Sequence, residues 1–100
     1  MSGYNFTEIY YSNHAVKQMF QREISTDEVE NVIKKGEVIK NYPDDKPYPS
    51  ILLFAFCNNR PLHVVCSNNF EEETIVVITA YEPTLDIWVS SFKEKKKEKS

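Results

Sequence analysis

The chain has 100 residues, of which 41% are hydrophobic and 27% charged, with a formal net charge of −3 at pH 7. This length and composition fit one globular core and exclude a disordered chain. Two cysteines and two glycines exclude a disulfide-stapled miniprotein and a glycine-rich phosphate-binding loop. No stretch approaches the roughly 20 apolar residues of a membrane helix, and no signal peptide is recognised, so we expect a cytoplasmic protein that does not enter a membrane.

Charge is divided unevenly between the body and the end of the chain. Residues 93–100 hold five lysines and two glutamates, a net charge of +3, which leaves −6 on residues 1–92. We therefore expect a single domain over residues 1–92 and a flexible lysine-rich tail over residues 93–100. A body of this charge repels a polyanion, so a nucleic acid would need a local basic patch.

The first strong pattern is that of an amphipathic helix over residues 13–22, preceded by residues 4–11, which fit a short strand or an irregular arm. Ser12 is a good N-cap for this helix. Its apolar side, which we expect to be buried, consists of Ala15, Val16, Met19 and Phe20. Its polar side carries a row of residues spaced by four: His14, Gln18 and Arg22.

A second helix is predicted to begin after Ser25. The segment Ser25-Thr26-Asp27-Glu28 has the Ser/Thr-x-x-Glu pattern of a capping box, in which a hydroxyl and a carboxylate each satisfy a free backbone N–H. An apolar stripe follows, made of Val29, Val32 and Ile33. Two lysines end the last turn, and we expect Gly36 to take the left-handed conformation common at helix C-termini.

After Gly36 the pattern becomes that of strands. Segments rich in Val, Ile, Phe and Thr predict strands over residues 37–42, 50–57, 61–67 and 73–81, with a further candidate over 87–92. Short turns separate the later strands, so these should form an antiparallel meander. The predicted fold class is α+β, with two N-terminal helices packed on one face of a four- to five-stranded, mainly antiparallel sheet.

Both faces of this predicted sheet are apolar. Along one strand, Ile51, Leu53 and Ala55 alternate with another apolar set: Leu52, Phe54 and Phe56. Helices cover only one face, so the other is either covered by a further segment, such as the loop over 42–49, or binds a ligand or a partner.

The two cysteines are predicted to be free thiols. If Cys57 and Cys66 lie on strands joined by the turn at 58–60, Cys66 faces a residue near Leu52, about five positions from Cys57. At about 3.3 Å per residue, that separation is too long for a disulfide.

The candidate chemistry rests on histidine, arginine and tyrosine. His63 lies on a strand hairpinned to the strand that carries Tyr81, and His14 shares its helix row with Arg22. If these groups meet on the open sheet face, they can act as general acid and base on a phosphodiester. The simpler interpretation is a structural His63 and a solvated His14. No metal-ligand spacing is present, so we expect no metal or other cofactor.

Several blocks of the chain resemble a widespread family of small prokaryotic domains of unknown function. The segments Ser12-Asn13-His14-Ala15, Met19 and Gln21-Arg22-Glu23-Ile24-Ser25 are similar to its Ser-x-His-Ala…Met-x-x-Arg-Gly-Ile-Ser opening. The resemblance covers residues 11–97 and continues through 36–39, 42–45, 49–50, 60–65, 78–83 and Trp88. The family commonly has Arg where this chain has Gln18, Gly where it has Glu23, and Arg in place of the tail lysines.

The resemblance extends to RelE/BrnT-type toxins and implies a RelE-like fold. It also implies a ribosome-dependent or free RNA endonuclease that a small antitoxin protein neutralises by filling the sheet face. The leading prediction is thus a metal-independent toxin-type RNA endonuclease, a hydrolase-like enzyme of a toxin–antitoxin pair. The ribose 2′-OH would attack the adjacent phosphate, with His14 or His63 as base and acid, Arg22 on the non-bridging oxygens and Tyr81 positioning the substrate. Further RNA contacts are expected from Gln18, Tyr42, Lys95, Lys96 and Lys97.

A second function class stays open. The chain is alternatively a non-catalytic RelE-like domain that binds a protein partner through its open sheet face. The net charge of −6 on residues 1–92 favours this alternative. The lysines of the tail are then a solubilising segment instead of an arm for a nucleic-acid backbone.

Overall fold

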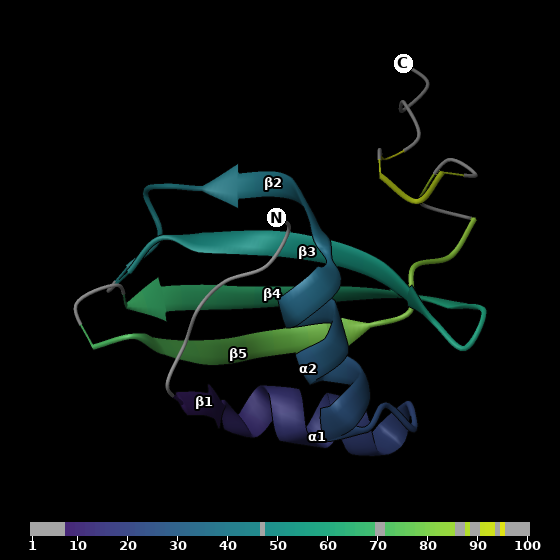
Figure 1. Ribbon diagram of the computed structural model, residues 1–100, viewed down its shortest axis with the longest axis horizontal. Helices are drawn as coiled ribbons and strands as arrows, with labels where there is room; N and C mark the ends of the chain where they lie inside the picture. Colours follow the sequence, from purple (N-terminus) through teal and green to yellow (C-terminus); the bar gives the residue numbers. More distant parts are fainter. Residues whose placement is uncertain are drawn as a thin grey trace.

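The computed structural model describes residues 8–46, 48–69, 72–85, 88, 91–93 and 95. Its elements follow in the order β1 (Glu8–Tyr11), α1 (Asn13–Gln21), α2 (Thr26–Lys35), β2 (Glu37–Tyr42), β3 (Ser50–Cys57), β4 (Arg60–Asn69) and β5 (Thr74–Tyr81). The strands form one sheet in the order β1-β5-β4-β3-β2 (Figure 1). β2 to β5 make the predicted antiparallel meander, whereas β1 joins β5 in parallel, so the α+β fold has a mixed sheet.

Ser12 connects β1 to α1 and fixes both to β5. Its backbone N–H donates to the Val77 carbonyl at 3.0 Å, and its hydroxyl donates to the Ile78 carbonyl at 3.0 Å. The same hydroxyl oxygen accepts from the Ala15 backbone N–H at 3.0 Å, which confirms the predicted N-cap. The first turn of α1 is thereby held on the strand that later provides one wall of the candidate site.

Helix α1 buries a narrower stripe than its apolar pattern predicts. Ala15 and Met19 are buried, but Val16 is 52% exposed and Phe20 is 86% exposed, so their predicted burial is wrong. The reason is the place of the helix: α1 packs against β5, beside the parallel edge strand β1 (Figure 1). One strand covers one helical row, and the neighbouring row that carries Val16 and Phe20 faces away from it.

Helix α2 has the predicted capping box. The Ser25 backbone N–H donates to the Glu28 carboxylate at 2.9 Å, and the Glu28 backbone N–H donates to the Ser25 hydroxyl at 3.1 Å. The prediction for Gly36 is wrong, because its backbone is extended, with φ −72° and ψ 162°. Glycine suits this position because a Cβ would lie 2.3 Å from the Val32 carbonyl oxygen.

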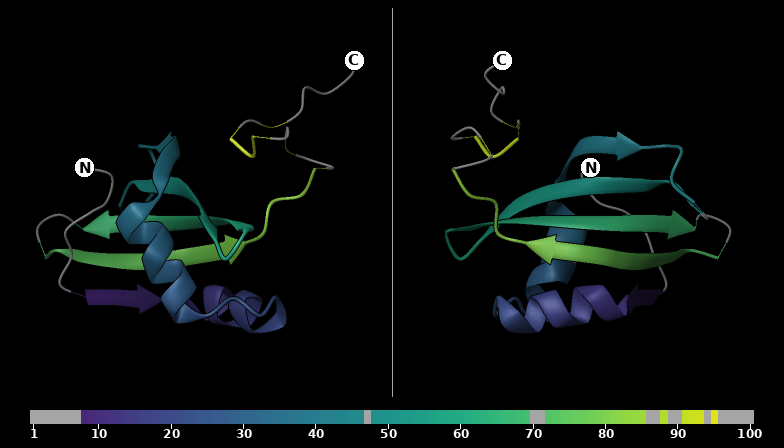
Figure 2. Two further views of the ribbon diagram at one scale, coloured as in Figure 1. Left: turned by 45° about the vertical axis from the view of Figure 1, so that its right-hand side comes forward. Right: turned by 180° about the vertical axis from the view of Figure 1, so that it is seen from behind.

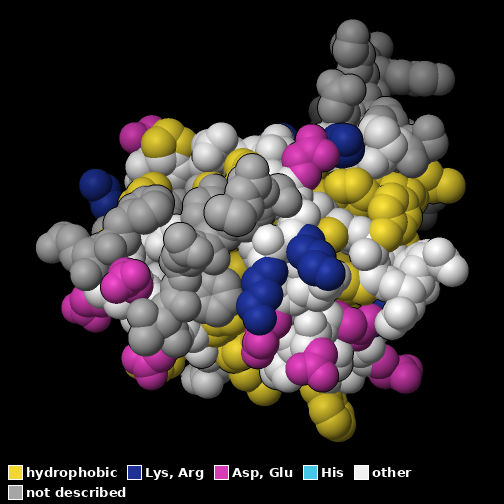
Figure 3. All heavy atoms as spheres, in the orientation of Figure 1, with side chains coloured by type: hydrophobic (Ala, Val, Ile, Leu, Met, Phe, Trp, Pro, Cys, Tyr) yellow, Lys and Arg dark blue, Asp and Glu magenta, His cyan; other side chains and the backbone are white. Residues whose placement is uncertain are grey.

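Helix α2 crosses one face of the sheet, whereas α1 runs along the edge beside β5 and continues the line of β1 (Figure 2). α2 packs on β3 and β4, and α1 packs on β5. The outer surface of this side is of mixed charge: acidic side chains are spread over it, and basic ones stand in small groups between them (Figure 3). The visible described surface on this side therefore offers a polyanion no continuous basic area. Neither helix of the described chain is long and apolar enough to cross a lipid bilayer.

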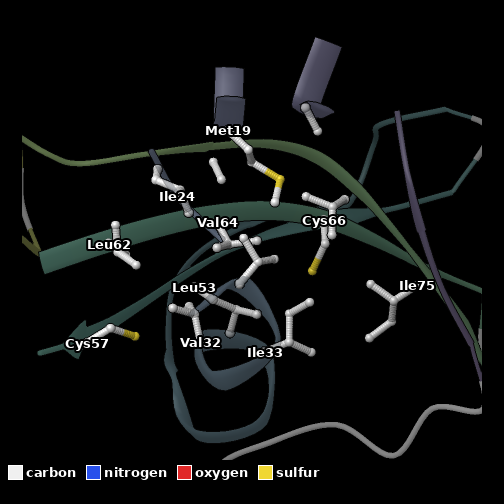
Figure 4. Close-up of a cluster of buried hydrophobic side chains, with 14 residues drawn as sticks. Met19, Ile24, Val32, Ile33, Leu53, Cys57, Leu62, Val64, Cys66 and Ile75 are labelled. Atoms are coloured by element: carbon white, nitrogen blue, oxygen red, sulfur yellow. The ribbon is translucent and has the colours of Figure 1, made fainter. Parts of the chain in front are cut away.

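The core lies between the helices and the sheet (Figure 4). Leu53, Val64 and Ile33 at its centre are fully buried. Cys57 and Cys66 are both buried and free, and the observed pairing of Cys66 with Ile51 is within one residue of the predicted register. Burial raises the pKa of the Cys66 thiol to about 12, so this group stays protonated at neutral pH.

The second face of the sheet is covered at one end by the chain that follows β5. The Trp88 ring lies 4.4 Å from the His63 ring, and the Phe92 ring lies 6.4 Å from that of Phe54. Lys93 makes an ion pair of 2.9 Å with Glu37 on β2. The sequence left open whether a further segment, a ligand or a partner covers the second sheet face. At this end of the sheet, residues that follow β5 cover it. Most of the predicted strand over 87–92 lies outside the described residues, although Trp88 forms an isolated antiparallel bridge with Lys95.

Candidate functional site

A cleft of about 420 Å³ lies where the end of α1, the end of β5 and the segment after β5 meet. Gln18 and Arg22 line it from the helix side, and Thr79 and Tyr81 line it from β5. The remaining lining residues belong to the following segment and are Glu82, Pro83, Thr84 and Trp88. The helix row and the strand that the sequence singles out therefore converge on one hollow, beside the covered end of the second sheet face.

Gln18 and Arg22 are held in the cleft by a small hydrogen-bond network. Arg22 Nη1 donates to Gln18 Oε1 at 2.8 Å and to the Ala80 carbonyl at 3.4 Å. The Thr79 hydroxyl donates to the same Gln18 oxygen. Among the described residues, both hydrogen-bond partners of the Arg22 guanidinium are bound to Nη1. The network orients the guanidinium while leaving its Nε and Nη2 donors for an oxyanion.

Tyr81 pairs with a histidine that no solvent reaches. His63 and Tyr81 are directly opposite on β4 and β5, and the Tyr81 hydroxyl lies 3.1 Å from His63 Nδ1. His63 Nε2 lies 2.8 Å from the backbone carbonyl oxygen of Phe92. The imidazole is 0% exposed and is enclosed by the aromatic rings of Phe54, Tyr81 and Trp88.

Burial keeps both members of this pair neutral at neutral pH. It lowers the pKa of His63, an effect that the hydrogen bond to the Phe92 carbonyl partly offsets. Burial also raises the pKa of Tyr81, and the electrostatic influence of the Tyr42 phenol adds to this. The pair is therefore a neutral imidazole next to a neutral phenol at the wall of a cleft that also contains a guanidinium.

The other predicted site residues lie around this cleft at different distances. His14 is exposed in the first turn of α1, about 12 Å along the helix from Arg22, and is not one of the residues that line the cleft. Tyr42 is half-buried on β2 and acts on Tyr81 through its electrostatic influence. Lys95 is exposed, with its Nζ 5.9 Å from the centre of the Trp88 ring. Lys96 and Lys97 lie outside the described residues.

Residues 11–82 match the model of a family described as "Domain of unknown function (DUF4258)". The chain belongs to this family. No curated protein and no solved structure matches it. The DUF4258 match contains Gln18, Arg22, His63 and Tyr81, whereas Trp88 and Phe92, which enclose the imidazole, follow it in the chain.

Five residues that line the cleft of this DUF4258 chain were not among the predicted site residues: Thr79, Glu82, Pro83, Thr84 and Trp88. Glu82 and Pro83 were noted only as part of a short turn and of the resemblance block 78–83, and Thr84 only as part of that turn. The carboxylate of Glu82 also lies 3.9 Å from Arg60 Nε, so the cleft lining contains an acidic side chain paired with a guanidinium other than that of Arg22. Pro83 was the one signal that the sequence could have offered, because an apolar residue in a polar turn often packs against its neighbours, and Pro83 is buried in the structure.

Proposed function

We propose that this protein is an RNA endonuclease that cleaves a phosphodiester bond in the cleft between α1 and the end of β5. The observation that carries the proposal is that Arg22 and Tyr81 line the same hollow. Gln18 and Thr79 support it, because they hold the guanidinium in a fixed orientation before any ligand arrives. Preorganised donors of this kind stabilise negative charge that develops on a phosphate during the reaction.

In the proposed reaction the ribose 2′-oxygen forms a bond to the adjacent phosphorus while the bond from phosphorus to the 5′-oxygen breaks. The proton of the 2′-OH passes to the Tyr81–His63 pair, and water at the exposed rim of the cleft protonates the departing 5′-oxygen. Arg22 binds the non-bridging oxygens of the phosphate. The hydroxide left by that water takes the proton back from the Tyr81–His63 pair, and the products are a 2′,3′-cyclic phosphate and a 5′-OH. The residues described here thus supply the base and the anion-binding group, and water supplies the acid.

The proposal keeps the toxin interpretation and its partner. A small antitoxin protein would block the cleft, and the substrate would be RNA, either free or on a ribosome. The net charge of −6 on residues 1–92 means that attraction to RNA has to come from Arg22 and from the lysines of the tail, of which Lys95 is described and exposed. Binding should therefore weaken strongly as the salt concentration rises.

A non-catalytic partner-binding domain is the second candidate, and one observation favours it. The acidic body, with Glu82 in the cleft lining, is better suited to a basic protein segment than to RNA. In that case the protein would bind a basic partner and would leave RNA intact at any protein concentration.

The test compares Arg22→Ala with Lys17→Ala. Both variants remove one positive charge from an exposed side chain, Lys17 within α1 and Arg22 at its C-cap, but Lys17 is not a residue of the cleft lining. We expect RNA cleavage by Arg22→Ala to fall by about 10²- to 10³-fold, the usual cost of one donor to a developing oxyanion. Lys17→Ala should stay within about threefold of the unmodified protein, which matches a modest non-specific electrostatic effect. Equal loss in both variants, or no cleavage by the unmodified protein with or without ribosomes, would refute the proposal.

A further inference from the structure

We infer that His63 is a positioning residue that turns the hydroxyl hydrogen of Tyr81 away from the cleft, so that the Tyr81 oxygen accepts a hydrogen bond from a ligand hydroxyl. With Arg22 in the same cleft, the ligand that fits is a hydroxyl next to a phosphate, which selects ribose over deoxyribose. The choice of ligand rests on the proposed function. The direction of the Tyr81 hydrogen bond does not, because it follows from the two contacts of the imidazole.

The first step is the bond between His63 and the backbone of Phe92. A carbonyl oxygen can only accept a hydrogen bond, so Nε2 at 2.8 Å from it must carry the hydrogen. A neutral imidazole has one N–H, which leaves Nδ1 with a lone pair. Burial supports the neutral form, because it lowers the pKa of His63.

The second step concerns Tyr81. Since Nδ1 is an acceptor, the Tyr81 hydroxyl at 3.1 Å must be the donor. The opposite tautomer would place the Nε2 lone pair against the lone pairs of the Phe92 carbonyl, leaving a buried acceptor without a partner. Water cannot compensate, because His63 is 0% exposed. The described rings around the imidazole belong to Phe54, Tyr81 and Trp88, none of which is charged at neutral pH.

The direction of this hydrogen bond determines which groups remain in the cleft for a ligand. A phenol that donates its only hydrogen to His63 retains lone pairs for a hydrogen bond from a ligand. Arg22 provides only donors, and its hydrogen bonds to described residues are all made by Nη1, so Nε and Nη2 remain for a ligand. The cleft thus combines one acceptor with a cationic donor, which is complementary to a ribose 2′-OH and its neighbouring phosphate. The 2′-OH is the group by which a protein distinguishes RNA from DNA.

The first experiment reads the tautomer directly in the ligand-free protein. In protein labelled with ¹⁵N at histidine, we expect the His63 Nε2 resonance of a protonated nitrogen and the Nδ1 resonance of an unprotonated one at pH 7.5. The variant Tyr81→Phe should move the Nδ1 resonance towards that of a free lone pair and leave Nε2 bonded to hydrogen. His14 serves as the internal control, since it is exposed and should show a mixture of tautomers. The reverse tautomer at His63 overturns the inference, whether or not the protein cleaves RNA.

The second experiment tests the ligand class with a probe that cannot be cleaved. The probe is a short ribo-oligonucleotide in which methylene replaces each bridging 5′-oxygen, compared with its 2′-deoxy counterpart. We expect the ribose form to bind about tenfold more tightly, the effect of one buried hydrogen bond. Tyr81→Phe should remove that preference and leave the affinity for the deoxy form unchanged, whereas Lys17→Ala should keep it.

The outcomes separate this inference from the proposed function. A ribose preference that depends on Tyr81 supports the inference even if native RNA is never cut, in which case the endonuclease proposal fails alone. Equal binding of the two probes by the unmodified protein overturns the assigned ligand class. RNA cleavage that depends on Arg22, together with equal probe binding, leaves the endonuclease proposal in place and removes the role assigned to the Tyr81 oxygen.

Discussion

Replacing Trp88 with alanine should both destabilise the protein and restore an ordinary pKa to His63. Trp88 is 3% exposed and its ring stands edge to face with the imidazole at 4.4 Å. A buried tryptophan removes about 200 Å² from water, which at about 25 cal/mol per Å² contributes about 5 kcal/mol as an upper bound. Because alanine retains part of this burial, we expect the free energy of unfolding to fall by about 3 kcal/mol.

The effect on His63 has a separate physical cause. Burial is the main reason that the pKa of His63 is lowered, so admitting water to the imidazole should move its pKa up towards the ordinary value of 6.5. The change in stability is measured by urea denaturation at pH 7.5, and the pKa is measured by titration of the His63 ring protons in NMR spectra.

Phe20→Ala is the matched control for this prediction. It also removes an aromatic ring, but Phe20 is 86% exposed, so the free energy of unfolding should change by less than about 0.5 kcal/mol. If Trp88→Ala costs less than about 1 kcal/mol and the pKa of His63 stays where it was, then the segment after β5 does not cover the imidazole and the reasoning is wrong.

Three further perturbations test the remaining structure. Leu53→Ala, at the fully buried centre of the core, should cost about 3 kcal/mol in urea denaturation, and a cost below about 1 kcal/mol would contradict its packing. Ser25→Ala removes the N-cap of α2 and should cost about 1 kcal/mol, with an unchanged value counting against the capping box. The free energy of unfolding should fall as the pH drops below about 6.5, because the pKa of His63 is lowered in the folded state and the unfolded chain then binds more protons. A second loss of stability should begin below about pH 4.5, because the hydrogen bond from the Ser25 backbone lowers the pKa of Glu28 in the folded state and the unfolded chain takes up the proton first. A flat stability profile between pH 7 and 5 would contradict the burial of His63.

The parts of the fold that the sequence predicted correctly depend on local rules. The capping box at Ser25 and Glu28 and the N-cap of α1 at Ser12 follow from hydrogen-bonding groups a few residues apart. The register of β3 and β4 follows from the short turn between them, which is why the separation of Cys57 and Cys66 was predictable.

The parts that the sequence did not predict depend on distant segments. Val16 and Phe20 have the pattern of a buried stripe, and only the position of α1 at one strand of the sheet exposes them. The parallel pairing of β1 with β5 joins residues more than 60 positions apart, which no local pattern signals. A glycine directly after a helix usually indicates a left-handed cap. Gly36 is instead required because the Val32 carbonyl approaches it too closely for a side chain.

The candidate site divides along the same line. The spacing of Gln18 and Arg22 on one helix row, and the pairing of His63 with Tyr81, could be predicted from helical and strand periods. His14 belongs to the same row but is two helical turns away from Arg22, so only Gln18 and Arg22 of the predicted row line the cleft. The partner of His63 Nε2 is a backbone carbonyl, and no side-chain pattern could have named Phe92.

The chemistry of the RNA ends tests the central claim most directly. Purified protein is incubated with RNA in the presence of EDTA, alone and with ribosomes, and the fragments are analysed by mass spectrometry. We expect fragments that end in a 2′,3′-cyclic phosphate and begin with a 5′-OH, produced by the unmodified protein and by Lys17→Ala but lost in Arg22→Ala. Intact RNA under both conditions, fragments with 3′-OH ends, or undiminished cleavage by Arg22→Ala would contradict it.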